Sequence, residues 1–206
     1  AGRLVYVFGT GHSHMLAEEL FYRAGGLARV VPMLHPPLML HESASTSTQA
    51  ERDPDVVGEL LKQYPMTGGD VLVVASNSGR NACPIELAML AKERSVRTIA
   101  VLNSEHSVKW ASRHPSGKRL GDVVDLVIDN CGVEGDACIP LPGSGLFVGA
   151  TSTVTGCLIM QMIACRATEM LYASGTPPDL YQSSNANHDD RNKALIAEHK
   201  KTNPHL

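Results

Sequence analysis

The sequence predicts an α/β fold in which a doubly wound sheet of five parallel strands lies between two layers of helices. The first observation is that short apolar runs rich in β-branched residues recur along the chain, as in residues 71–74, and each is too short for a helix. The second is that longer segments with helical spacing of apolar residues separate these runs. The third is that the runs are apolar throughout rather than alternating, which is typical of parallel strands covered on both faces.

Length and composition predict one domain. A chain of 206 residues with 43% hydrophobic residues can bury one sizeable core. We therefore expect a single domain over residues 1–206, in which residues 177–206 form a polar C-terminal extension with a modest helix over about 191–200. The composition of this tail is also typical of a disordered end. Alternatively, its polar cluster around Asn185, Asn187 and His188 closes over the site of a neighbouring subunit.

Charge and composition argue against several classes of partner. The net charge is −3, and the nearest thing to a basic patch, Arg113-His114 with Lys118-Arg119, is short and indicates a solvated loop, so we expect no nucleic acid. No apolar run is expected to reach the roughly 20 residues of a membrane span, and no signal peptide is evident. The five cysteines form no C-x-x-C pair, and their odd number favours a reducing compartment. A soluble cytoplasmic protein is therefore expected.

The first strand, residues 4–8, leads through a glycine-rich turn at residues 9–13 into a helix that we expect to end near Gly25. This arrangement invites a dinucleotide interpretation, but the fingerprint fails. His14 stands where the third glycine belongs, and the next strand, residues 30–34, ends in His35 rather than in an acidic residue. We expect no cofactor. His12, at the mouth of the turn, is either a phosphate neighbour or simply solvated.

We expect residues 35–53 to form a long loop, which in a compact α/β domain is usually functional or disordered. The apolar residues 38–40 argue against disorder. His41 and Glu42 stand side by side in this loop, and an adjacent acid and imidazole form a pair whose protonation can be tuned toward neutral pH. The alternative is a solvated loop tip.

The stretch from residue 70 to residue 81 is the segment that we expect the other strands and helices to hold in position. Its strand ends in a turn that contains Ser76, Asn77 and Ser78, followed by Gly79, which permits a positive φ, and by Asn81, which can cap the next helix. Backbone amides, the positive end of the helix dipole and uncharged hydroxyl donors then meet in one small volume. This arrangement predicts a phosphate site, although the same residues also suit an ordinary βα connection.

The remaining elements complete the alternation. We expect a helix over residues 54–64, a helix from residue 81 to about 94, a strand over 98–102, a short helix capped by Asn103 and a strand over 123–128. That last strand carries Asn130 and Asp136 toward the carboxyl edge of the sheet, where ligands bind in doubly wound folds. A long apolar helix over residues 149–172 follows, and its composition predicts burial on several sides.

Three of these segments together resemble the sugar isomerase (SIS) domains. Residues 76–81 are similar to the Ser-x-Ser-Gly-x-Thr/Asn signature of that family, residues 9–13 to its first Gly-x-Gly-x-Ser loop, and residues 151–153 to its third element. The matches come in the family's order and span residues 3 to about 173. The resemblance implies that a phosphosugar is bound by Gly11, His12, Ser13, Ser76, Asn77, Ser78, Gly79, Asn81, Thr151, Ser152 and Thr153.

The resemblance also implies a choice of functions. In phosphoheptose and arabinose-phosphate isomerases the family interconverts aldose and ketose phosphates through an enediol, and by that interpretation Glu42 moves the proton, His41 assists ring opening and Glu19 is the alternative base. Ser78-Gly79-Arg80-Asn81 also looks like the Ser-Gly-Arg-Thr of the N-acetylmuramic acid phosphate etherases, which keeps a lyase open. A non-catalytic phosphosugar sensor is the third possibility.

Two further expectations come from the resemblance. The spacing of the metal ligands known in some phosphoheptose isomerases is not reproduced after the first loop, so no metal is expected. A helix normally precedes the first strand in this family, whereas here the strand opens at residue 3. Together with the apolar helix over residues 149–172, this predicts an apolar surface covered by a partner, in a homodimer or homotetramer.

Overall fold

The computed structural model describes residues 3–186 and 189–206 and is built around a parallel sheet of five strands. The strand order is β2-β1-β3-β4-β5, and every neighbouring pair is parallel. The predicted doubly wound α/β fold is therefore confirmed. The five strands are β1 (Val5–Gly9), β2 (Val30–Met33), β3 (Val71–Ala75), β4 (Arg97–Leu102) and β5 (Leu126–Asp129).

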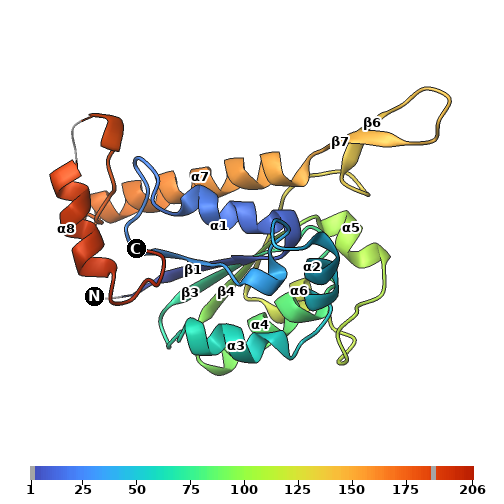
Figure 1. Cartoon of the computed structure of the whole chain (residues 1–206), viewed down its shortest axis with the longest axis horizontal. Coiled ribbons are helices and arrows are strands. Elements are labelled where there is room, and N and C mark those ends of the chain that lie inside the picture. The colour runs from blue at the N-terminus through green and yellow to red at the C-terminus, as the bar shows by residue number, and fades with distance from the viewer. Residues whose placement is uncertain (1–2, 187–188) are drawn as a thin grey trace.

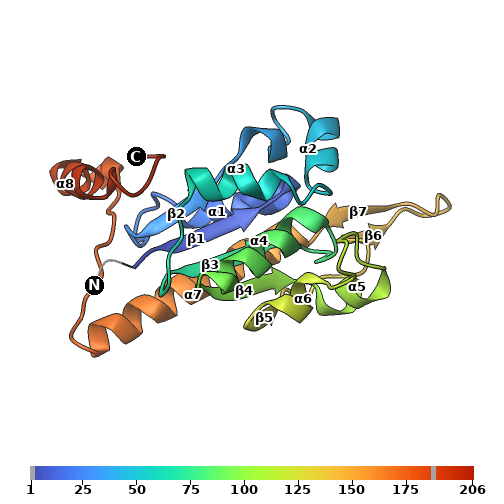
Figure 2. The same ribbon diagram turned by 90° about the horizontal axis from the view of Figure 1, so that it is seen from below.

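Helices cover both faces of this sheet (Figures 1 and 2). One face carries α1 and α7, and the other carries α3, α4 and α6. A two-stranded antiparallel hairpin, β6 (Ala137–Pro140) and β7 (Phe147–Ala150), projects from one end of the molecule (Figure 1). The helices are α1 (Met15–Leu20), α2 (Ala44–Ala50), α3 (Val56–Gln63), α4 (Ala82–Glu93), α5 (Ser104–Lys109), α6 (Leu120–Val123), α7 (Ser152–Ala173) and α8 (Asp189–His199).

The central strand β3 holds the two layers together. Successive side chains of a strand point to opposite faces, so Leu72 and Val74 enter the core beneath α3 and α4, whereas Val73 and Ala75 enter the core beneath α1 and α7. All four are at most 3% exposed. Full burial of a Val or Leu side chain contributes about 1.5 to 3 kcal/mol, so β3 is firmly fixed and its end is a rigid support for the loop that follows.

Two predicted boundaries were wrong. Helix α1 ends at Leu20, several residues before Gly25, because Phe21 has an extended backbone and Tyr22 a φ of 48°. Gly25 instead donates its amide to the carbonyl of Tyr181, so tertiary contact with the C-terminal segment shapes this turn. The strand expected over residues 123–128 begins only at Leu126, because a short helix, α6, occupies the residues before it.

The long loop predicted over residues 35–53 contains a 3₁₀ turn (Pro36–Leu38) and α2. The hydroxyl-rich run forms a helix because Ser43 caps it, accepting a hydrogen bond from the amide of Thr46. Ser47 is buried and donates its hydroxyl to the carbonyl of Leu38, which itself is fully buried. The expectation that residues 38–40 oppose disorder is confirmed, whereas the absence of secondary structure was wrong.

Helix α7 is much less buried within the chain than its composition predicted. Its buried residues are Gly156, Met160 and Ala164, on the side that faces α1. A Cβ at Gly156 would lie 2.8 Å from Leu16, so glycine permits the close approach of these two helices. The opposite side exposes apolar side chains, of which Val154 is 72% and Leu158 62% exposed.

The length of α7 corrects a second expectation. We expected no apolar run long enough for a membrane span, but this helix of 22 residues meets the length and composition of one. Core helices of soluble proteins meet the same test. Here one side of α7 packs on α1 in the core, and the apolar residues on its other side are those that the chain leaves uncovered.

The C-terminal region packs on the sheet edge rather than forming a disordered end. Leu195 of α8 packs with Tyr181 and Ala28 in a small apolar cluster. The side-chain amide of Asn203, 2% exposed, donates to the carbonyl of Val30 in the edge strand β2. The predicted helix is confirmed at residues 189–199. Asn187 and His188 of the polar cluster lie outside the described residues, so its proposed closing role stays a prediction.

Candidate functional site

Three loops meet in one small pocket at the carboxyl edge of the sheet. Five of the predicted binding residues line it together, namely Ser13 from the first loop, Ser76 and Asn77 from the central loop, and Ser152 and Thr153 from the start of α7. The other lining residues are Leu16, Ala75, Val101 and Asn130. The remaining predicted residues, Gly11, His12, Ser78, Gly79, Asn81 and Thr151, belong to the same three segments but do not line this pocket.

The first loop is a 3₁₀ turn (Gly11–His14) directly after β1. A Cβ at Gly9 would lie 2.4 Å from the backbone of Ser13, so only glycine allows the chain to fold back this tightly. Gly11 has a φ of 55°. His12 is exposed, whereas His14 is buried and its Nδ1 contacts the carbonyl of Gly11. The tight turn therefore directs Ser13 into the pocket and His12 toward solvent.

The central loop after β3 is held by its own polar groups. The amide of Gly79, whose φ is 55°, donates to the carbonyl and the hydroxyl oxygens of Ser76. The side-chain amide of Asn130 donates to Oδ1 of Asn77 at 2.8 Å, which joins the ends of β3 and β5. This bond fixes Asn77 beside the pocket. Asn130, which the sequence placed only at the sheet edge, is thereby a buried part of the site.

Asn81 does not cap α4 with its side chain as expected. It occupies the N-cap position, but its Oδ1 accepts a hydrogen bond from the guanidinium of Arg113 at 2.7 Å. Desolvation of Arg113, followed by the nearby charges of Arg80 and Arg52, lowers the pKa of this guanidinium from its ordinary value. Three arginines therefore bring positive charge to the side of the central loop.

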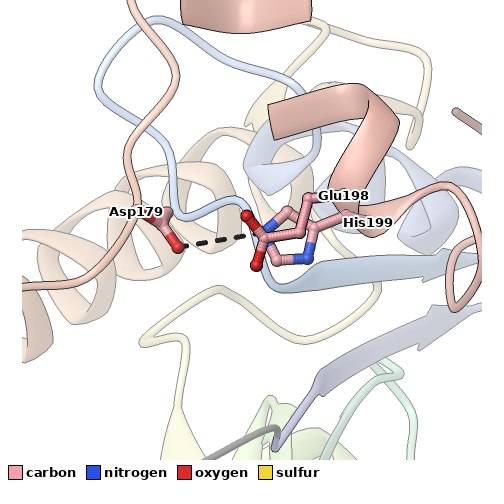
Figure 3. A group of neighbouring side chains, drawn as sticks. All are labelled: Asp179, Glu198 and His199. Carbon is pink, nitrogen blue, oxygen red and sulfur yellow. Dashed lines mark ion pairs between the residues drawn. The ribbon is translucent and has the colours of Figure 1, made fainter. Parts of the chain in front are cut away.

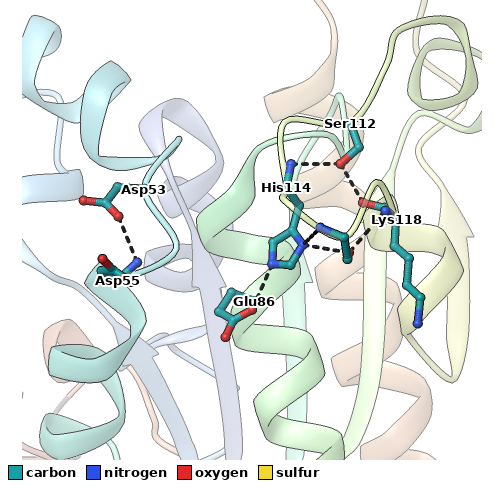
Figure 4. Close-up of polar contacts among 7 residues, drawn as sticks. Asp53, Asp55, Glu86, Ser112, His114 and Lys118 are labelled. Carbon is teal, nitrogen blue, oxygen red and sulfur yellow. Dashed lines mark hydrogen bonds and ion pairs between the residues drawn. The ribbon is translucent and has the colours of Figure 1, made fainter.

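The loop that supplies Arg113 is exposed at Arg113 and Lys118, as the sequence predicted, but it is anchored to the fold at His114 (Figure 4). His114 is buried, and its Nε2 lies 2.8 Å from the carboxylate of Glu86 on α4. Its Nδ1 lies 2.7 Å from the hydroxyl of Ser116. The Nε of Arg80 donates to the carbonyl of Ala111. Glu86 is thus part of the anchor.

The carboxylate of Asp136 lies at the start of α7. The residues of the third element do not cap the helix with their side chains; instead the carboxylate of Asp136 accepts the amides of Thr151 and Ser152 at 3.0 and 2.7 Å and both of their hydroxyls. Burial by itself raises the pKa of Asp136, but the hydrogen bonds from Ser152 and Thr151 outweigh it and hold the pKa below its ordinary value. The negative charge at this helix end leaves the central loop as the better place for another anion.

The predicted catalytic pair lies beside the first loop and is not among the residues that line the pocket. Nε2 of His41 and the carboxylate of Glu42 are 3.6 Å apart, and their side chains are 68% and 58% exposed. The rings of His41 and His14 have their centroids 6.4 Å apart, which places the pair beside the first loop. Nε2 of His14 lies 3.9 Å from the carboxylate of Glu18, one helical turn along the chain. Two histidines and two carboxylates therefore gather here.

Glu19, the predicted alternative base, faces away from the pocket. Its carboxylate accepts a hydrogen bond from the side-chain amide of Gln161 on α7 and lies 3.3 Å from Arg23. The side chain joins α1 to α7, because residues 18 and 19 are about 100° apart around the helix and only one of them can face the first loop. Of the two adjacent acids, Glu18 is the one beside His14.

Sequence reasoning missed Glu51. Its carboxylate accepts the hydroxyl of Thr10 at 2.8 Å, and its carbonyl accepts the amide of Cys83 at the start of α4. It thereby joins the first loop to the helix that follows the central loop. Thr10 and Glu51 are 41 residues apart, and no motif marks Glu51.

None of the described residues that line the pocket is a His, Cys, Asp or Glu, the side chains that most often hold metals. Among the described residues, the group of such side chains with suitable spacing lies far from the pocket, near the end of α8, and consists of Asp179, Glu198 and His199.

Comparison with known proteins identifies relatives over the whole chain. The family model described as the SIS domain matches residues 1–103. A UPF0309 protein of Listeria innocua serovar 6a is 42% identical over 204 residues, which are 98% of this chain and 83% of the relative. A UPF0309 protein of Halalkalibacterium halodurans is 42% identical over 189 residues, covering 92% of this chain and 78% of the relative.

Among solved structures, a phosphoheptose isomerase from Neisseria gonorrhoeae is similar to this chain with a TM-score of 0.48 and 19% identity. The similarity covers 80% of this chain and 75% of that protein.

The role of the Asp136 charge can be tested by Asp136→Asn. Asparagine also tolerates the positive φ of this residue, 71°, so the change removes charge and leaves the backbone geometry intact. At pH 7 we expect the free energy of unfolding to fall by about 1 to 2 kcal/mol, allowing for partial exposure. Because the native pKa is lowered, this stabilisation is present above the unfolded value of about 4 and is lost as pH falls through the native pKa. Urea denaturation across pH 7 to 3 measures it, and a difference that grows on acidification would contradict the assignment.

Proposed function

Because this chain belongs to the SIS-domain family, we propose that it binds a phosphorylated sugar in the pocket at the carboxyl edge of the sheet. One observation carries the proposal. Ser13, residues 76–77 and residues 152–153, which are far apart in the sequence, line the same pocket. All of these side chains are neutral hydrogen-bond donors or amides, which suit the hydroxyls and phosphate of a sugar phosphate.

The phosphate is best accommodated by the central loop, residues 76–81. This loop joins a buried strand to α4, a helix of 12 residues whose positive end faces the loop. Arg113 bonds to Asn81 and adds positive charge beside it. The corresponding end of α7 already holds the Asp136 carboxylate, which repels a second anion. These charges favour a phosphate at residues 76–81 and the sugar over Ser13 and residues 152–153.

The reaction that we propose is aldose–ketose isomerisation through an enediol. His41 donates a proton to the ring oxygen as the bond from that oxygen to the anomeric carbon breaks, and the anomeric hydroxyl releases its proton to water, from which His41 is reprotonated; the sugar is then open, with a free carbonyl. Glu42 removes the proton from C2 and returns it to C1, while a proton moves from the C2 hydroxyl to the carbonyl oxygen at C1. No oxidant is needed, because the two carbons exchange oxidation states. His41 and Glu42 lie 3.6 Å apart beside the first loop, and a bound sugar would bury this exposed pair and so strengthen its interactions.

The two alternative functions, a lyase and a sensor, require different features of the site. Arg80, which suggested the etherases, donates its Nε to Ala111 and so has a structural use here that needs no ether substrate. A sensor needs binding alone. Incubating the protein in deuterated water with a panel of aldose and ketose phosphates distinguishes the three. The proposal expects deuterium at C1 or C2; binding without exchange favours the sensor, and release of the ether substituent from an amino-sugar phosphate favours the lyase.

We also propose that a second copy of the chain covers the exposed side of α7, giving a homodimer or a dimer of dimers. Leu158 and Met162 are 62% and 61% exposed on this side. The same helix begins with Ser152 and Thr153 in the pocket, so a partner on α7 would lie next to the site. The five cysteines are all free, and a cytoplasmic location is proposed with this assembly.

The phosphate position is tested by Ser78→Ala. Ser76 accepts the amide of Gly79 and therefore also holds the turn, whereas Ser78 takes no part in that bond. We expect the change to weaken phosphosugar binding by about 1.5 to 3 kcal/mol, the range for a hydrogen bond to a charged group, and to leave the affinity for the unphosphorylated sugar nearly unchanged. Calorimetry with both ligands measures this, and an equal loss for both would refute the assignment.

The proton-transfer role is tested by Glu42→Gln, with Glu59→Gln as control. Glu59 is also exposed but pairs with Lys62 on α3. Loss of a general base typically costs at least about 10²-fold in turnover, and we expect this for Glu42→Gln with phosphosugar affinity retained. The control should keep full turnover. Near-normal turnover of Glu42→Gln would exclude Glu42 as the base and direct the same test to Glu18 and Glu51.

Assembly is tested by the double variant Leu158→Glu with Met162→Glu. Two buried charges at a subunit contact are strongly unfavourable, so light scattering at micromolar concentration should find a monomer where the unchanged protein is a dimer or larger. Val108→Glu is the control, because Val108 is 66% exposed but lies on α5. A monomeric unchanged protein would refute the assembly.

A further inference from the structure

We propose that Asp179, Glu198 and His199 form a binding site for one divalent transition-metal ion of the zinc class, at the C-terminal end of α8 and separate from the sugar pocket. One imidazole nitrogen and two carboxylates are the ligand set that suits zinc, and an imidazole ligand argues against magnesium and calcium. Three protein ligands leave a further coordination position for water. Figure 3 shows the three side chains gathered together.

The distances between these side chains suit ligands of a shared metal ion better than they suit direct hydrogen bonds. One ligand atom from each residue lies within 4.8 Å of the others. Nε2 of His199 is 4.0 Å from Oδ2 of Asp179, which is beyond hydrogen-bonding distance. Zinc bonds to nitrogen and oxygen are about 2.0 to 2.2 Å long, so two ligand atoms on one ion stand about 3 to 4 Å apart. Small side-chain rotations of Asp179 and Glu198, neither of which is buried, would complete the set.

His199 supplies the independent observation. Its residue is 3% exposed, yet among the described residues its Nε2 has no hydrogen-bond partner. A buried polar atom without a partner is costly, and such atoms in native proteins usually have a partner such as an ion or a water molecule. The nitrogen points toward the Asp179 carboxylate (Figure 3). A metal ion between the two would satisfy the nitrogen and the carboxylate together.

The surrounding backbone also favours a cation. His199 ends α8, a helix of 11 residues, and the partial negative charge at a helix C-terminus attracts positive charge. Asp179 lies on the segment that leaves α7, and its carbonyl accepts the amide of Ala28 just before β2. The ion would therefore connect α8 to the segment beside β2, at the end of the sheet opposite to the pocket. Its expected role is to fix the C-terminal region on the sheet edge.

The full-length protein, freed of metal with a chelator, should bind one zinc ion per chain in calorimetry, and zinc should raise its melting temperature. Cobalt should give the visible absorption of a low-symmetry site. Asp179→Asn and Glu198→Gln should each weaken zinc binding at least tenfold and reduce the rise in melting temperature. Because His199→Ala could fail to fold, these two variants carry the test. Asp190→Asn, which changes another exposed acid of α8, should bind as the unchanged protein does.

Several outcomes would overturn the site. Absence of stoichiometric binding, or equal binding by Asp179→Asn and Glu198→Gln, would show that zinc does not use these residues. Equal weakening in Asp190→Asn would indicate only general attraction to the acidic surface. An Nε2 proton on His199 in the NMR spectrum of the zinc-treated protein would show that an ion pair with Asp179 takes the place of the metal. None of these results depends on sugar binding, so the site stands or falls apart from the proposed function.

Discussion

The burial of β3 on both faces is the constraint on which the rest of the structure depends. Its side chains enter two separate cores, one beneath α3 and α4 and the other beneath α1 and α7. If the register of such a strand shifted by one residue, every side chain would move to the opposite face of the sheet and would no longer fit the core on that face. The loop that follows is therefore fixed in space. β1 and β4 flank β3 in parallel, so the loops after these strands reach the same edge.

At that edge, the distribution of charge distinguishes two helix ends that look alike in the sequence. The loop that leads into α4 and the first turn of α7 both contribute hydroxyl groups to the pocket, from Ser76 and from Ser152 and Thr153. Asp136 neutralises the start of α7, whereas Asn81 at the start of α4 is bonded to the cationic Arg113. One helix end is thus already complete, and the other is flanked by positive charge. This difference in charge is the reason that we propose the phosphate on the β3–α4 side of the pocket.

The two ends of the sheet hold different groups of residues. At the carboxyl edge lie the pocket, the pair His41–Glu42 beside the first loop, and the arginines around Asn81. The opposite end is closed by the C-terminal region, whose Asn203 bonds to β2 and whose His199 is buried without a partner among the described residues. Helix α7 runs between the two ends (Figure 1). Its exposed apolar side, on which we propose a second copy of the chain, therefore begins beside the pocket.

The sequence by itself determined the parallel strands and the central loop, because these depend on local signals. Apolar runs of β-branched residues identify strands, and Gly79 and the short polar residues before it are what a tight βα turn requires. It also indicated that Ser13 and Ser76 would meet, since loops after parallel strands share an edge, and the resemblance to SIS domains added Ser152. Local signals were weaker for α2, whose serines and threonines have low helix propensity and are held by the contact of Ser47 with Leu38.

Only the tertiary structure decided which polar groups pair. The bonds of Asp136 to Ser152, of Arg113 to Asn81 and of Thr10 to Glu51 join residues 16 to 41 positions apart, and Glu19 turns to Gln161 across 142 positions. A side chain's partner over such separations depends on helix rotation and loop path, which no local pattern encodes. For this reason the sequence identified the central loop that lines the pocket, but it revealed neither the bond of Glu19 to Gln161 nor the bond of Glu51 to Thr10.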